Sequence, residues 1–161
     1  MAATYRQLGF MDTAMVFYRE ALERSSGEHN RDGMRSALQA LADVLLDSDM
    51  LDSSLIYSRR ALVIANEMDS PLPRAAIEHH IGVTYLFAGQ LDSAKVYLEQ
   101  GLHRYRALAV ESGEAAALAN LGLLRLKTVS DDSTVSLLRA ALGLRQRSQD
   151  KAGEAEPRLH L

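Results

Sequence analysis

The chain has 161 residues, of which 18 are Lys or Arg and 21 are Asp or Glu, so its formal net charge is −3 at pH 7. The two signs are interspersed along the chain, which excludes the basic stripe expected of a nucleic-acid-binding face. There is no cysteine, so disulfides, thiol nucleophiles and thiolate metal sites are excluded, and we expect a cytoplasmic protein.

Only three prolines and ten glycines interrupt a chain rich in alanine, leucine, glutamate and arginine, a composition that favours an all-α protein. No apolar run reaches the roughly 18 residues needed to span a bilayer. The first residues also lack the apolar core of a signal peptide. We therefore expect neither a membrane segment nor export.

Helices and turns are expected to alternate along the chain. After a short helix that ends near Leu8, helices are predicted at residues 12–26, 32–46, 51–68, 74–87, 91–110, 114–127 and 131–148. Gly27 and Gly113 favour turns between neighbouring helices. Pro71 and Pro73 separate two more, because proline is tolerated only in a first helical turn.

Aspartate stands near the start of every second helix. The four residues are Asp12, Asp52, Asp92 and Asp132. A carboxylate in the first turn accepts hydrogen bonds from free backbone N–H groups and opposes the positive end of the helix dipole, which contributes about 0.3–1 kcal/mol each. We therefore interpret these aspartates as helix caps and not as catalytic acids.

A spacing of small, aromatic and leucine residues recurs every forty residues without a gap. Its first copy consists of Ala2, Tyr5, Gly9, Asp12, Ala14, Tyr18, Ala21 and Leu22, and the third consists of Gly82, Tyr85, Gly89, Asp92, Ala94, Leu98, Gly101 and Leu102. A period of about forty residues also fits HEAT and armadillo repeats. The spacing within each copy must therefore identify the type of repeat.

A small residue followed by an aromatic residue three positions on, alanine twelve on, an aromatic sixteen on and alanine nineteen on resembles the tetratricopeptide repeat (TPR). This resemblance implies an all-α, right-handed α-solenoid of antiparallel helix pairs, a TPR-like superhelix. The common unit has about 34 residues. The longer unit here resembles those of kinesin light chains and of bacterial peptide-responsive regulators and sensor kinases, and we expect its extra residues between one helix pair and the next.

The repeat divides the chain into units of one array that covers residues 1–161. The expected units are residues 1–28, 29–68, 69–110 and 111–150, followed by a truncated fifth helix at residues 151–161. Met1 and Leu161 occupy the same mid-helix position, so we expect a segment of a longer array. Apolar residues at both ends lack a neighbouring repeat, which favours a homodimer through the exposed array ends.

The sequence contains no recognisable catalytic motif. It has no Gly-rich phosphate loop, no Gly-x-Ser-x-Gly elbow and no His-Glu-x-x-His pair. His79 and His80 are adjacent on a predicted helix, so their side chains diverge by about 100°. Their neighbours one helical turn away include no metal ligand. We therefore expect no enzymatic activity, no metal and no cofactor.

The TPR resemblance also implies which residues line the concave face of the array. In TPR proteins the first helix of each unit, helix A, faces the ligand. Carried onto this sequence, the candidate groove consists of Gln39, Asp43, Asp47, His79, His80, Val83, Phe87, Asn120, Leu123 and Lys127. His80 is expected to lie near Asp43 of the preceding unit. Leu46, Leu86 and Leu126 recur at one repeat position and are expected to pack between units.

These residues form a mixed surface in which apolar side chains stand beside hydrogen-bonding groups. Such a surface suits a peptide segment, whose side chains enter apolar pockets while polar groups hold its backbone. We therefore predict a non-enzymatic scaffold that binds a protein or peptide ligand in its helix-A groove. The alternative is a ligand-sensing regulatory segment of a larger sensor kinase or transcription regulator.

Overall fold

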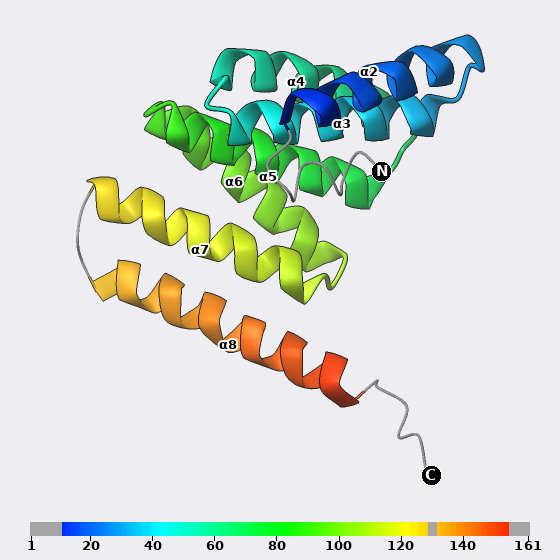
Figure 1. The fold of residues 1–161 in the computed structure, drawn as a ribbon. Helices are drawn as coiled ribbons and strands as arrows, with labels where there is room; N and C mark the ends of the chain where they lie inside the picture. The colour runs from blue at the N-terminus through cyan, green and yellow to red at the C-terminus, as the bar shows by residue number, and fades with distance from the viewer. Residues whose placement is uncertain (1–10, 129–131, 155–161) are drawn as a thin grey trace.

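The computed structural model describes residues 11–128 and 132–154, and these residues form seven α-helices and no strand (Figure 1). The helices are α2 (Met11–Gly27), α3 (Arg31–Asp47), α4 (Leu51–Glu67), α5 (Pro71–Phe87), α6 (Leu91–Ala107), α7 (Glu111–Thr128) and α8 (Asp132–Glu154). The expected all-α architecture is confirmed for this part of the chain. None of these helices is long and apolar enough to cross a membrane.

The turns from α2 to α7 share one conformation. Each has three residues, and the middle residue has a positive φ: His29, Asp49, Asp69, Gly89 and Ala109, with φ between 48° and 71°. The residue after it donates its backbone N–H to a carbonyl five residues earlier, at 2.8–3.0 Å, which is the Schellman pattern. Glycine adopts a positive φ without steric cost, so Gly89 is the best suited of the five.

The extra residues of the repeat lengthen the helices. Helices α2 to α6 each contain 17 residues, and each is followed by three turn residues, which gives a step of 20 and a period of 40. The expectation that the extra residues lie between one helix pair and the next is therefore wrong. A hydrophobic pattern identifies a helix face, but it does not determine where the helix ends.

The aspartates of the repeat also differ from their expected role. Asp12, Asp52 and Asp92 are the second residues of α2, α4 and α6, where a carboxylate still opposes the helix dipole. The N-cap positions of α4 and α6 are held by Met50 and Gln90, which make no side-chain cap bond. Among the described helices, α3 has a side-chain cap, because Asn30 Oδ1 accepts the Gly33 N–H at 2.9 Å.

The C-terminal part of the array also differs from what the sequence predicts. The helix expected at residues 131–148 continues to Glu154, so residues 151–154, which were expected to begin a fifth helix, belong to α8. The remaining part of the expected fifth helix, residues 155–161, lies outside the described residues, as do Met1, Tyr5 and Leu8 of the other end. The homodimer through the array ends therefore remains a prediction.

Small residues allow the two helices of a unit to approach closely. A Cβ atom added to Gly82 on α5 would lie 2.8 Å from both the Cγ atom and the backbone nitrogen of Leu98 on α6. One repeat later, a Cβ atom on Gly122 would lie 2.6 Å from Leu138 Cδ2. Distances below 3.0 Å are closer than van der Waals contact. The close approach of α5 and α6 therefore requires a glycine at position 82.

The helices form two layers along the array. The first helices of the units, α3, α5 and α7, are helices A, and α2, α4, α6 and α8 are helices B. Helix α5 packs against α4 and α6, which are helices B, and also contacts α3 and α7 (Figure 1). Neighbouring helices A therefore form one continuous surface. The C-terminal ends of α3, α5 and α7 all lie on the same side of the array.

Candidate functional site

The candidate groove is built from one side of each helix A. Residues three or four positions apart share a helix face, and this spacing groups the ten predicted residues into three stripes. The stripes are Gln39, Asp43 and Asp47 on α3; His79, His80, Val83 and Phe87 on α5; and Asn120, Leu123 and Lys127 on α7. Because α5 contacts both α3 and α7, the stripe on α5 lies between the other two.

His80 joins α5 to the preceding unit. Its Nδ1 atom lies 3.0 Å from Asp43 Oδ1 on α3, and its Nε2 atom lies 3.1 Å from Ser54 Oγ on α4. The Ser54 hydroxyl donates its single hydrogen to the Ala42 backbone carbonyl at 2.9 Å. A carboxylate can only accept, so Nδ1 carries the hydrogen of the bond to Asp43. The expected proximity of His80 and Asp43 is confirmed.

His79 joins α5 to the following unit. Its Nε2 atom lies 2.9 Å from Asn120 Nδ2 on α7, and its ring packs edge-on against the Tyr105 ring, with 6.1 Å between centroids. Burial lowers the pKa of His79 below its ordinary value of 6.5; the neighbouring His80 lowers it further, and a hydrogen bond to the Ala116 backbone opposes both. The neutral ring can therefore accept the Asn120 N–H at Nε2.

The lowered pKa of His79 predicts a pH dependence of stability. Below about pH 6.5 the unfolded chain takes up a proton at His79 that the folded chain does not bind. Stability should therefore be lost as the pH falls from about 6.5 towards the lowered pKa of the folded state. Urea denaturation between about pH 5 and pH 8 should show a flatter profile for His79→Gln.

The matched control for this measurement is His103→Gln, which changes an exposed histidine on α6. This variant should retain the pH profile of the unchanged chain. Identical profiles for the two variants would show that burial of His79 does not contribute to the pH dependence.

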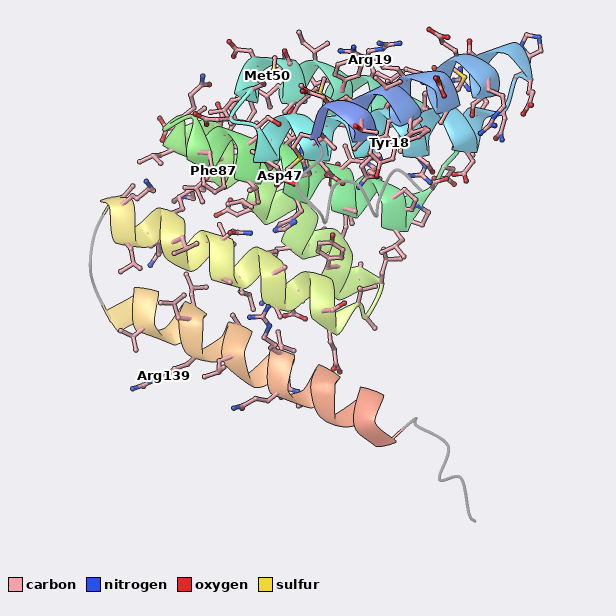
Figure 2. All side chains as sticks on the ribbon, in the orientation of Figure 1. Tyr18, Arg19, Asp47, Met50, Phe87 and Arg139 are labelled. Atoms are coloured by element: carbon pink, nitrogen blue, oxygen red, sulfur yellow. The ribbon has the colours of Figure 1, made fainter. Side chains whose placement is uncertain are left out.

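Phe87 is the most exposed large apolar side chain among the described residues, with 69% of its surface accessible. Leu123 and Leu126 on α7 are each 48% exposed. Figure 2 shows Phe87 at the C-terminal end of α5, on the same side of the array as Asp47 at the C-terminal end of α3. The most accessible apolar groups of helices A therefore belong to α5 and α7.

Two other apolar residues serve mainly to pack the helices. Val83 is half-buried against the core, so less of its side chain is available to a ligand than expected. Leu86 is only 6% exposed, which confirms packing at that position. The equivalent Leu126 is exposed, so the expectation of packing is wrong there.

The remaining groove residues are polar. Gln39 is half-buried, and its Oε1 atom accepts from Arg35 Nη1 at 3.4 Å. Asp47 and Lys127 are exposed and belong to the last turns of α3 and α7. They have opposite charges and lie on the side of the array that also carries Phe87.

A buried carboxylate was missed by the sequence reasoning. Glu78 on α5 is 3% exposed, and its two oxygens lie 3.0 Å from Arg74 Nε and 2.6 Å from Arg104 Nε. A signal was present in the repeat, because leucine stands at the equivalent positions Leu38 and Leu118, which are 1% and 3% exposed. A charge at a leucine position predicts a buried partner of opposite charge.

The described residues contain no group of three or more His, Cys, Asp or Glu side chains that could hold a metal ion. Four polar side chains of the groove bond in two pairs between neighbouring units: His80 with Asp43, and His79 with Asn120. The site therefore combines hydrogen-bonding groups in fixed positions with exposed apolar groups.

Several solved structures have the same fold. BtubC from P. vanneervenii superimposes with a TM-score of 0.79 at 22% identity, over 91% of this chain and 60% of that chain. The apo form of RapI gives a TM-score of 0.84 at 18% identity, over 96% of this chain and 57% of that one. A putative kinesin light chain of Podosopora anserina with nearly identical TPR-like repeats gives a TM-score of 0.59 at 18% identity. The match covers 99% of this chain and 94% of that chain.

The fold is a TPR-like α-solenoid. The right-handed superhelix of antiparallel helix pairs expected from the sequence is thereby confirmed. No family model matches the sequence, and no curated protein matches it. The chain spans about three fifths of the length of the BtubC and RapI chains, so the likeness concerns the TPR-like array alone.

Proposed function

We propose that this chain is a non-enzymatic scaffold whose helix-A groove binds a segment of another protein. The observation that carries the proposal is the exposure of Phe87, 69% accessible on a helix whose other large apolar groups are mostly buried. Aromatic side chains that are exposed in the free protein often contribute most of the binding free energy when a partner covers them. Leu123, which is 48% exposed on the neighbouring helix α7, is a second accessible apolar group on the helix-A side.

The polar pairs of the groove would position the bound segment. Asp43 and Asn120 are held by His80 and His79, so their side chains are already ordered before a ligand arrives. Ordering in advance reduces the entropy lost on binding. The Asn120 carboxamide also has an oxygen acceptor and a second N–H donor, groups that match the backbone of an extended peptide.

A random peptide library displayed on phage provides a probe that requires no known partner. Peptides selected on the unchanged chain should bind the double variant Phe87→Ala/Leu123→Ala about tenfold more weakly or worse, measured by fluorescence polarisation. The expected loss follows from removal of two exposed apolar anchors, one on α5 and one on α7.

The matched control is Ile56→Ala/Val96→Ala, which removes two apolar side chains from helices B with similar exposures of 58% and 51%. This control should bind the selected peptides as the unchanged chain does. The proposal fails if the control variant loses binding and the groove variant retains it, or if selection yields no peptide.

A further inference from the structure

A cavity of about 740 Å³ opens between α6, α7 and α8, and it shares no lining residue with the groove. Its apolar wall consists of Leu91, Leu102, Leu121, Leu124 and Leu137. Lys95, Glu99 and Arg125 also line it, and all three are exposed. The cavity therefore combines an apolar interior with a charged rim.

One repeat earlier, side chains fill the equivalent space. Leu55, Tyr85 and Tyr97 stand forty residues before Lys95, Arg125 and Leu137. Leu55 and Tyr85 are 8% and 7% exposed, and the two tyrosine rings lie 5.7 Å apart between centroids. The Tyr85 hydroxyl is hydrogen-bonded to Arg59 Nη2. The repeat therefore accommodates aromatic rings at this location.

The differences between the two units account for the cavity. Arg125 and Leu137 remove the two rings, and Lys95 replaces a buried leucine with a side chain that reaches solvent. Glu99 stands where the preceding unit has Arg59. A hydrogen-bond donor for a phenolic oxygen is thus replaced by an acceptor, which would bind an O–H or N–H group.

We propose that this cavity binds an aromatic ring that carries an O–H or N–H donor, as in a phenol or an indole. The ring would occupy the space that tyrosine fills in the preceding unit, between the leucine side chains. Its donor would bond to the Glu99 carboxylate, which lies 4.0 Å from Lys95 Nζ at the rim. The volume is within the range of about 300–1,000 Å³ typical of ligand pockets.

The first test uses p-cresol and indole as probes on the full chain with methyl-labelled leucine. NMR titration should shift the methyl signals of Leu102, Leu121, Leu124 and Leu137 and leave Leu123 of the groove unchanged. Toluene has the ring but no donor, and it should bind about tenfold more weakly than p-cresol. The proposal is overturned if neither probe shifts the cavity leucines, or if the shifts concentrate at Leu123.

The second test fills the cavity. Arg125→Tyr/Leu137→Tyr reproduces the tyrosine pair of the preceding unit and should abolish binding of both probes. Phe87→Ala, which changes the groove, should bind them like the unchanged chain. If the double variant does not fold, Glu99→Leu provides a milder change, which should reduce p-cresol affinity to that of toluene. Unchanged p-cresol binding by either cavity variant contradicts the proposal.

Free small molecules and partner side chains can both supply such a ring. Titration with a short peptide that contains one tyrosine, compared with its phenylalanine counterpart, distinguishes these sources. Tighter binding of the tyrosine peptide than of p-cresol assigns the cavity to a partner's side chain. Binding of p-cresol alone assigns it to a free phenol, and binding of neither overturns the proposal.

Discussion

Gly82→Leu should lower the free energy of unfolding by about 3 kcal/mol, because it overpacks the contact between α5 and α6. An added Cβ atom at this position meets the Leu98 side chain and also its backbone nitrogen, each at 2.8 Å. A side chain can change rotamer, but the backbone of α6 cannot move without displacing the helix. Urea denaturation followed by circular dichroism measures the loss.

Gly143→Ala provides the matched control. It also lies inside a helix, α8, but an added Cβ atom there has no neighbour within 4 Å. Alanine should therefore stabilise the chain by up to about 1 kcal/mol through its higher helix propensity. Equal stability of Gly82→Leu and the unchanged chain would show that α5 and α6 do not pack as closely as the structure has them.

Arg104→Ile should destabilise the chain by about 3 kcal/mol, because it leaves the buried Glu78 carboxylate without its closer partner. Isoleucine is the residue of the preceding unit at this position, where Ile64 is 6% exposed. The double variant Glu78→Leu/Arg104→Ile restores the apolar pair of that unit. It should be as stable as the unchanged chain or more stable by about 1–4 kcal/mol.

The full double-mutant cycle also includes Glu78→Leu alone, with all variants measured by urea denaturation. Arg106→Ala is the control, since it breaks the more exposed pair of Arg106 with Glu114 and should cost less than about 1 kcal/mol. If the double variant loses as much stability as Arg104→Ile alone, the apolar residues cannot replace the ion pair and the equivalence of the two units fails.

The groove shows which contacts can be predicted from equivalent positions in neighbouring repeats. The pairing of His80 with Asp43 could be predicted, because it depends on which positions of neighbouring units face each other. The packing of Val83 against the core could not be predicted, because the repeat position of a valine does not tell whether its side chain is half-buried or accessible. Exposure depends on how far apart neighbouring helices A lie, and this distance is set by side chains from the whole interface.

The sequence by itself determined the all-α repeat, the pairing of helices and the proximity of His80 to Asp43. These properties follow from periodic positions that recur every forty residues, so each copy supports the interpretation of the others. Only the tertiary structure decided where the helices end, that Glu78 is buried between two arginines, and that a cavity opens beside Arg125. Each of these depends on the volumes and charges of side chains that come together from separate helices. The forty-residue period of the sequence does not specify those volumes and charges.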